Sequence, residues 1–541
     1  MKSFDEDLAI TLSLTIAGQT YAIPAGDVKS LALDLRTYGF NGQVSFVVSA
    51  EDTTDQLFTP ITTQSDLIEV SLQVAVFVIP EGATSTPLKL TGLVTTRGFY
   101  EQTLSNVLPS QEYMIKRYYQ LDFADPAQVL WQQHHPCDLL TDSDLQTLIT
   151  AHTSDKITLV YDWDVLQTVY PVLSLSLGAA VSPASFYDYI IWLVDSNNGV
   201  FTYDFANNKY TFSAAKSQTG QAQSLDAFEI AKFGIEFPEV LRFQPNVLNS
   251  YSESAQITAI SNSQMASPMR RDYIASYPIA ADMQARVTLE TARFKQRLHE
   301  VWVEFQKFQL QVTPPGQLVN FQGSSAWNAS LFNQPNSYRV RQWRMQARAQ
   351  EQQGQVPGYS HYAIDLSLQL EGEAELWVDL PAYQRPLYPV FVEGKVVSET
   401  GADTDATYQF YTDDNTSINY YQVSIPLWAN KNIRTAYQPN MDTGQFYFPP
   451  YKHARVMIGL GFNSAYIAYF LDWGVGTALP LDSQGNQLVM GTSTTSQNII
   501  KHTYVDSKPE LQIQRTQDKD VELLQFSDGY IIIQTQQEEG S

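Results

Sequence analysis

Alternating apolar and polar residues dominate the first hundred positions of the chain. This alternation predicts strands at 8–18, 28–37, 42–50, 67–79 and 86–100. The segments between them are rich in Gly, Pro and Asn, which are typical turn residues. The pattern therefore predicts a β-barrel or β-sandwich over residues 1–110.

Helical patterns interrupt the strands between residues 111 and 225. Asp125-Pro126 combines an N-cap residue with proline at the first helical position, so it predicts a helix start. A second helix is expected from Ser143. A third is expected over 185–194, followed by a turn at Asn197-Asn198-Gly199 and two strands that are joined at Asn207-Asn208. This region is predicted to be an α+β segment.

Strand alternation returns over 226–387, which predicts a second barrel. Strands are expected at 255–263, 301–312, 336–349 and 361–378, with a loop at Pro314-Pro315-Gly316 and a long Gln-rich loop over 350–358. Ala, Arg, Glu and Leu are mixed over 281–300, which favours a helix there.

A small closed barrel of about five short strands fits residues 388–478. Its first segments contain Val392, Lys395, Val397, Tyr408 and Phe410. We expect them to be broken at Gly394, at Gly401 and at Asp413-Asp414-Asn415.

Three segments with partial or full alternation lie near the end of the chain, at 510–516, 521–527 and 530–536. Turns are expected at 518–520 and 527–529. Leu511 and Ile513 face away from Gln512 and Gln514, because side chains alternate along a strand. A ribbon of three strands is at best marginally stable alone, so we expect another chain to cover its apolar face.

The charge and the composition of the chain limit the classes of partner that it is expected to bind. The chain has 541 residues, a formal net charge of −24 and one cysteine, Cys137. Nucleic acid and anionic membrane surfaces would repel such a chain, so neither is an expected partner. An acidic N-terminus without a basic segment predicts no secretory signal, and no apolar run is long enough to span a bilayer. The lone cysteine is compatible with a cytosolic origin.

Catalytic and metal-binding motifs are weak. His134-His135-Pro136-Cys137 contains zinc-ligand types, but adjacent histidines seldom share an ion and no second cysteine follows. Pairs such as Asp413 and Asp414 carry no specificity for glycoside hydrolysis. We therefore expect no enzyme, no cofactor and no metal. The aromatic strand 200–205 could form a sugar-binding face, although alternating aromatics are more often core.

The order of these segments resembles the VgrG-type spike proteins of type VI secretion systems and the hub and needle proteins of contractile phage tails. The resemblance lies in the barrel segments 391–397 and 453–473, the Gly485-Asn486 turn, the strands of 30–52 and the strand 337–345. The helix and hairpin block carries it most specifically, through Phe186, Tyr189, Trp192, Gly199, Phe201, Tyr203 and Phe205. Two departures are the long Gln-rich loop and the lack of a valine-glycine repeat.

The resemblance implies a mainly β protein with an α+β insertion: two tube-like hub β-barrels, a small OB-like barrel over 388–478 and an intertwined β-needle over 479–541. It implies a homotrimer at the tip of a contractile injection machine. The needle core would consist of Leu511, Ile513, Val521, Leu523, Phe526, Ile531 and Ile533.

Further implications concern partners and location. A hexameric inner-tube protein, baseplate proteins and a PAAR-like tip protein or an effector would bind the trimer, and the needle would cross the target membrane transiently. The chain would be made in the cytoplasm and join a tail-like particle. One alternative is a monomeric carbohydrate-binding or carbohydrate-active β protein, and another is the hub of a non-contractile phage tail.

Overall fold

The computed structural model describes residues 3–49, 55–104, 114–178, 183–217, 220–321, 337–350, 360–402, 409–414, 419–436, 450–472, 486–493 and 495–537. The chain divides into two compact units. Unit 1 contains residues 1–135, 152–166 and 184–385, and unit 2 contains residues 136–151, 167–183 and 386–541. Strands dominate both units, so the predicted mainly β fold with an α+β segment is confirmed.

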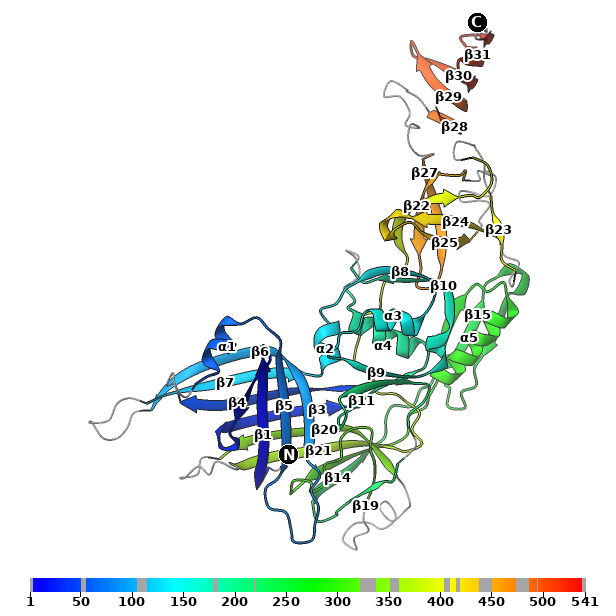
Figure 1. The fold of residues 1–541 in the computed structure, drawn as a ribbon. Helices are drawn as coiled ribbons and strands as arrows, with labels where there is room; N and C mark the ends of the chain where they lie inside the picture. The colour runs from blue at the N-terminus through cyan, green and yellow to red at the C-terminus, as the bar shows by residue number, and fades with distance from the viewer. Residues whose placement is uncertain are drawn as a thin grey trace. The chain divides into compact units, whose positions relative to one another are not determined.

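Unit 1 contains a closed ring of eight strands among the residues that the structure describes. Its hydrogen-bonded order is β20-β3-β4-β7-β6-β5-β1-β21, and β20 pairs with β21 to close it (Figure 1). The strands are β1 (Phe4–Ile16), β3 (Val28–Arg36), β4 (Gly39–Ser49), β5 (Ile68–Val76), β6 (Leu88–Leu104), β7 (Met114–Ala124), β20 (Tyr338–Ala349) and β21 (Ser360–Gly372). Alternate residues of β1 from Leu8 to Ile16 are buried, as a strand with one core face requires.

The long strands β20 and β21 also carry a second set of strands. Residues 342–348 of β20 pair with β3, whereas Tyr338 and Arg339 pair with β19 (Leu318–Phe321). Residues 360–364 of β21 pair with β1, whereas 367–371 pair with β18 (Glu300–Phe305). β13 (Gln223–Leu225) and β14 (Ile230–Glu236) extend this set. Strands expected in two hub barrels thus share one sheet, and the domain boundaries within it stay a prediction.

Three further features of this region were not predicted. β7 is a ring strand, although its residues were assigned to the α+β segment. β2 (Gln19–Ile23) pairs with β1, and α1 (Phe58–Thr63) follows the ring strand β4. The short helical turns of the described residues, in both units, are η1 (Ala25–Asp27), η2 (Asp164–Gln167), η3 (Ser252–Ser254) and η4 (Pro426–Trp428).

The α+β segment of unit 1 confirms the expected helix starts. α2 (Pro126–Trp131) begins after Asp125, whose carboxylate accepts a hydrogen bond from the Gln128 N–H group. α4 (Phe186–Ser196) begins after Ser185, and Ser185 and Asp188 form a reciprocal capping box. β11 (Val200–Asp204) and β12 (Lys209–Ser213) form the predicted hairpin, and β9 (Thr158–Asp162) pairs with β12.

A three-stranded sheet and one helix form a smaller part of unit 1. The sheet has the order β16 (Gln256–Ala259), β15 (Gln244–Asn249), β17 (Arg270–Ala275), and α5 (Ala280–Arg293) contacts β15. The helix predicted over 281–300 is wrong at its C-terminal end. Phe294 is extended and packs into the core of this part, and β18 already begins at Glu300.

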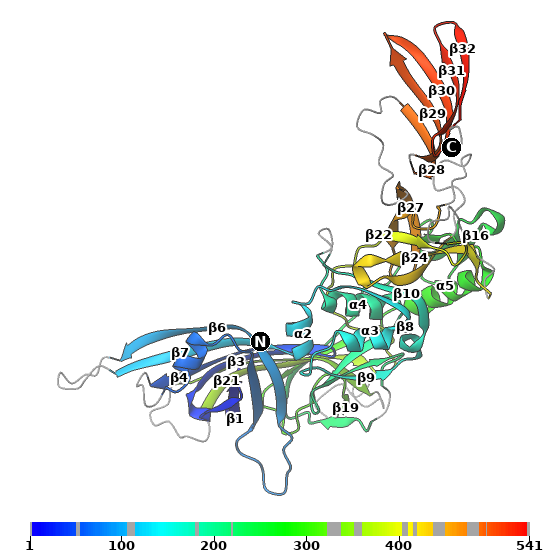
Figure 2. The same cartoon turned by 45° about the horizontal axis from the view of Figure 1, so that its top comes forward.

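Unit 2 contains the expected small closed barrel. Five of its strands close in the order β22-β24-β25-β27-β26, and β25 and β27 form its one parallel pair within the described residues (Figure 2). They are β22 (Val390–Val397), β24 (Asn419–Ile425), β25 (Lys431–Ala436), β26 (Arg455–Leu460) and β27 (Ala465–Asp472), while β23 (Tyr411–Thr412) pairs only with β24. β8 (Cys137–Asp144) and β10 (Val169–Ser176) form a ribbon that was not predicted and that adds Leu139 and Val172 to the barrel core. The second expected helix is α3 (Leu145–Ala151), which begins two residues later than predicted.

Gly394 does not break a strand, which corrects the sequence interpretation. It lies inside β22, where a Cβ atom would come within 2.5 Å of a Val423 methyl carbon. The glycine is therefore required by close packing rather than by a turn. Tyr408, Asn415, Trp473, Gly485 and residues 351–358 lie outside the described residues.

The C-terminal sheet of unit 2 is an antiparallel meander of five described strands, where three were predicted. β28 (Asn486–Ser493) and β29 (Ser496–Val505) precede β30 (Lys508–Gln517), β31 (Asp520–Ser527) and β32 (Tyr530–Gln536). The turns at 518–519 and 528–529 are confirmed, and Asp518, Asp528 and Gly529 adopt the positive φ that tight hairpins use.

Candidate functional sites in the C-terminal sheet and in unit 1

One face of the C-terminal sheet carries a continuous aliphatic row. The strand register places Leu488, Ile500, Ile513, Leu524 and Ile533 side by side across all five strands. A second row on the same face contains Leu511, Phe526 and Ile531. We call this surface the aliphatic face. It gathers five of the seven predicted needle-core residues.

Val521 and Leu523 lie on the opposite, polar face of the sheet. Their side chains cannot share a face with Phe526, because residues on one strand face differ by an even number of positions. Sequence interpretation missed Leu488, Ile500 and Leu524. Of these three, only Leu524 could have been assigned to this face by counting alternate positions from Phe526. In β28 and β29, consecutive apolar residues hide the alternation that such a count needs.

The aliphatic face is open to solvent in the single chain. Ile513 is 43% exposed, Ile531 61% and Ile533 79%. The polar face is different, because Glu510 is buried there and accepts hydrogen bonds from Gln512 (2.7 Å) and Gln525 (2.6 Å). The polar face is mixed, because the register also places Val489, Ile499 and Leu523 on it beside Gln514, whereas the aliphatic face exposes two rows that are mostly apolar.

The histidine-cysteine segment does not form a metal cluster. His134 lies 3.0 Å from His152, ring nitrogen to ring nitrogen, and His135 bonds the Ala184 carbonyl. Cys137 is exposed. Within the described ranges, no three His, Cys, Asp or Glu side chains are close enough to hold a metal ion.

The aromatic strand of the α+β segment is core rather than a sugar-binding surface. Phe201, Tyr203 and Phe205 are all buried, and the ring of Phe201 stacks on Tyr210 at 5.4 Å between centroids. Phe186 and Tyr189 are buried as well. The block that carries the family resemblance is therefore a packed aromatic core.

A buried carboxylate joins three elements of this core. Asp125 caps α2, accepts a hydrogen bond from the Phe40 N–H group (3.1 Å) at the start of β4, and accepts another from the Tyr210 hydroxyl on β12. Burial raises the pKa of Asp125 to about 6, against the lowering effect of these hydrogen bonds. A Cβ atom on Gly39 would come within 2.2 Å of this carboxylate, so Gly39 makes room for it.

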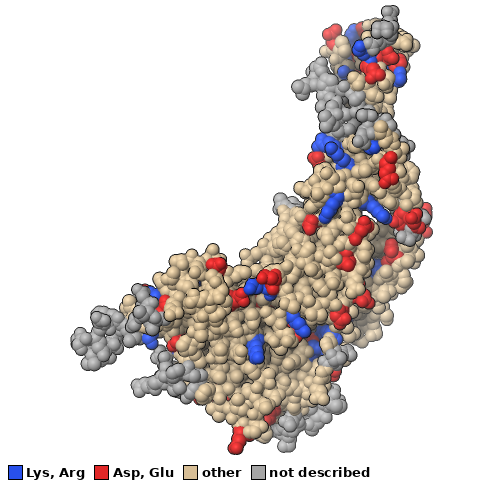
Figure 3. All heavy atoms as spheres, viewed as in Figure 1, with Lys and Arg blue, Asp and Glu red and all other residues tan. Residues whose placement is uncertain are grey.

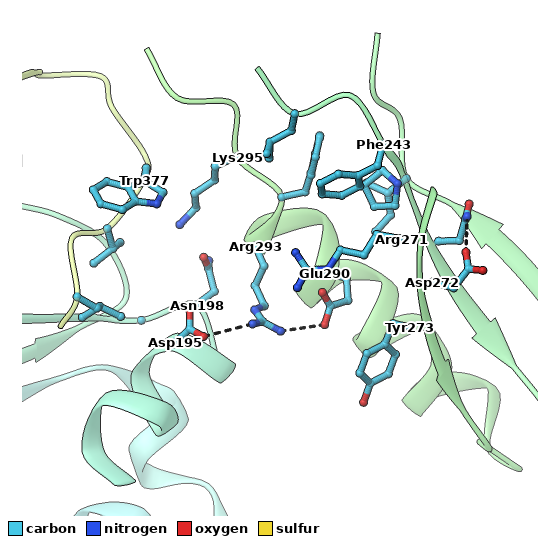
Figure 4. Close-up of a pocket in the computed structure, with 18 residues that line it drawn as sticks. Asp195, Asn198, Phe243, Arg271, Asp272, Tyr273, Glu290, Arg293, Lys295 and Trp377 are labelled. Carbon is cyan, nitrogen blue, oxygen red and sulfur yellow. Dashed lines mark hydrogen bonds and ion pairs between the residues drawn. The ribbon is translucent and has the colours of Figure 1, made fainter. Parts of the chain in front are cut away.

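Unit 1 also contains a cavity of about 460 Å³, which we call the hub pocket (Figure 4). Its walls come from the end of α4, from β15 and β17, from the end of α5 and from residues 377–380. Figure 4 shows Lys295 and Asn198 pointing toward the space beside Trp377, with Phe243 and Arg271 across it. Sequence interpretation did not find this pocket, because its residues come from segments about 180 positions apart.

Charged side chains on the face of the molecule in Figure 3 are scattered, with acidic and basic groups interspersed. The net charge of −24 therefore does not gather into one acidic patch on that face. Among the described residues, no helix combines the length and the apolar character that crossing a bilayer requires.

Comparison with solved structures identifies the fold. A chain of the Francisella PdpA-VgrG complex in its lidded form matches with a TM-score of 0.70 and 12% identity, covering 98% of this chain and 80% of that chain. The chain has a VgrG-like fold. The lidless PdpA-VgrG complex matches with a TM-score of 0.69 and 12% identity, covering 99% of each chain. The half-lidded Francisella complex matches with a TM-score of 0.70 and 12% identity, covering 98% of this chain and 88% of that chain.

No protein-family model matches the sequence, and no curated protein matches it either. The VgrG-like fold was nevertheless predicted from segment order and aromatic pattern. At 12% identity the likeness concerns the fold, which extends over nearly the whole chain.

Proposed function

We propose that this chain is the hub and spike at the tip of a contractile injection machine, where it adapts a hexameric inner tube to a trimeric membrane-piercing needle. The VgrG-like fold supports this role. The observation that carries the proposal is the aliphatic face of the C-terminal sheet, which is exposed in the single chain and spans all five described strands.

Three copies of the C-terminal sheet would bury this face around one axis. Full burial of a Leu or Ile side chain contributes about 1.5–3 kcal/mol, so the half-exposed residues of two rows supply several kcal/mol per chain. The needle core of this proposal keeps Leu511, Ile513, Phe526, Ile531 and Ile533. It replaces Val521 and Leu523 with Leu488, Ile500 and Leu524.

The hub would lie in the strands of unit 1. The ring closed by β20 and β21, together with β13, β14, β18 and β19, supplies two strand sets per chain. Three chains would present six such sets, which suits a hexameric inner-tube ring. The order of the five barrel strands in unit 2, with its parallel pair, supports the OB-like assignment. Baseplate proteins and a PAAR-like tip protein or effector are the further partners of this proposal. The role is mechanical rather than catalytic, within a tail-like particle assembled from cytoplasmic protein.

Light scattering on the purified full chain tests the trimer, with paired variants on the two faces of one strand. The mass expected is three times 60.9 kDa. I513E places a charge on the aliphatic face, where burial without a partner costs several kcal/mol, and should produce monomers. The matched control Q514E adds the same charge to the polar face, and its mass should stay that of a trimer.

A monomeric wild-type chain would contradict the proposal and favour the alternative, a carbohydrate-binding β protein. An I513E variant that remains a trimer would exclude the aliphatic face as the assembly surface.

A further inference from the structure

The hub pocket of unit 1 has the size and the wall chemistry of a small-ligand site. Its volume of about 460 Å³ lies within the usual range of roughly 300–1,000 Å³. Leu241, Val378 and Leu380 supply aliphatic surface, and the rings of Phe243 and Trp377 supply flat apolar surface. Transfer of a flat apolar group of a ligand from water to this surface would therefore be favourable.

Most charges around the hub pocket are already neutralised by neighbours. Arg293 pairs with Asp195 at 3.5 Å and with Glu290 at 3.1 Å. Asp272 accepts a hydrogen bond from Asn246 at 2.8 Å and pairs with Arg270 at 3.0 Å. These charged side chains already interact with one another, so they have few free hydrogen-bonding positions for a ligand.

Lys295 and Arg271 are different. Among the residues that the structure describes, no carboxylate pairs with either of them within 4 Å, and the guanidinium of Arg271 lies 5.8 Å from the centre of the Phe243 ring. Lys295 is half-buried, and its pKa is lowered chiefly by that burial and further by Lys216. Lys216 is itself paired with Glu371 at 2.5 Å, whereas Glu375 and Asp195 act on Lys295 only as negative charges beyond ion-pair distance, which partly offset the lowering of its pKa.

A hydrogen-bonding group accompanies this lysine. Asn198 follows α4 with a positive φ of 58°, and its side-chain amide points into the same space as Lys295 (Figure 4). No hydrogen bond occupies that amide within the described part of the chain. An ammonium group beside a free amide can bind one carboxylate through charge-assisted and neutral hydrogen bonds.

We propose that the hub pocket binds a monovalent carboxylate that is carried next to a flat apolar group. The carboxylate lies against Lys295 and Asn198, and the apolar group lies between Trp377 and Phe243. A phosphate dianion fits less well, because it has no apolar surface to place against Trp377 and Phe243, and because Arg293 is already paired with Asp195 and Glu290 and does not balance a second negative charge. The source of the carboxylate is either a free aromatic acid or the C-terminus of a polypeptide that ends in an aromatic residue.

Calorimetric titration of the full chain with three probes tests the ligand class. N-acetyl-phenylalanine carries the carboxylate, N-acetyl-phenylalaninamide lacks it, and inorganic phosphate carries charge alone. We expect the acid to bind at least about tenfold more tightly than the amide, because only the acid can accept a charge-assisted hydrogen bond from Lys295. Equal affinity of acid and amide, tighter binding of phosphate, or no binding of the acid would overturn the proposal.

Variants assign the binding to this pocket. K295Q should weaken the acid about tenfold and leave the amide unchanged, whereas the control K89Q removes an exposed lysine on β6 and should bind the acid as the wild type does. An unchanged acid affinity of K295Q would overturn the site. Melting curves of both variants confirm folding, and their light-scattering mass separates this test from that of the trimer.

A hexapeptide that ends in phenylalanine separates the two sources of the carboxylate. Tighter binding than N-acetyl-phenylalanine, lost on C-terminal amidation, supports a polypeptide end as the ligand. Affinity no greater than that of N-acetyl-phenylalanine supports a free aromatic acid.

Discussion

The buried carboxylate of Asp125 gives stability a pH dependence of known sign. Its pKa is raised to about 6 in the folded protein, from an ordinary value of 3.8. A raised pKa means that the folded state favours the neutral acid. The stability that protonated Asp125 contributes to the folded state is therefore fully present below pH 4 and is lost as the pH rises through 6.

The magnitude follows from the two pKa values. One pKa unit corresponds to about 1.36 kcal/mol, so the loss between pH 4.5 and pH 7.5 is about 2 kcal/mol. D125N removes this titration and keeps an N-cap for α2, because Asn caps helices about as well as Asp. The difference in opening free energy between wild type and D125N should therefore shrink by about 2 kcal/mol over that range.

Amide hydrogen exchange measured by mass spectrometry on peptides covering 126–131 is the suitable assay. It reports the local opening of α2 in a large chain, after correction for the intrinsic pH dependence of exchange. D122N, at a partly exposed acid on β7, is the control and should leave α2 exchange unchanged at each pH. A wild-type to D125N difference that stays constant or grows with pH would refute the reasoning.

Three glycine and cap substitutions test the packing. G199A places a Cβ atom 2.4 Å from the Trp163 ring, and this overpacking should destabilise unit 1 by roughly 1–3 kcal/mol and lower its melting temperature. The control is G98A, whose Cβ atom meets nothing within 4 Å and which should leave the melting temperature unchanged. G394A should destabilise the small barrel by a similar amount, and protease resistance of residues 386–472 would measure it; unchanged resistance would contradict the packing argument. S185A removes the capping box of α4 and should cost about 1 kcal/mol in denaturant unfolding, which an unchanged midpoint would disprove.

Local signals in the sequence located much of the fold. Asp125-Pro126 and Ser185 indicated helix starts, because a helix cap depends only on residues that are close together in the sequence. The hairpin turn at Asn207-Asn208 is likewise local, since Asn208 adopts a positive φ. Alternation located most ring strands of unit 1, because each has one buried face.

Other features depend on distant contacts and could not be predicted. β1 pairs with β21 and β3 with β20, which join residues more than 300 positions apart, and no local pattern specifies such partners. The end of α5 at Arg293 depends on where Phe294 packs. Strand parity, which the sequence alone provides, places Val521 and Leu523 on the face opposite Phe526, so the seven residues predicted for the needle core do not lie on one face.

Electron microscopy of the purified full-length chain tests most directly whether the aliphatic face holds three copies together. We expect particles with a three-fold axis along which three C-terminal sheets wind, with Ile513 facing that axis. Single-chain particles, or a C-terminal sheet whose aliphatic face packs against its own polypeptide, would contradict it.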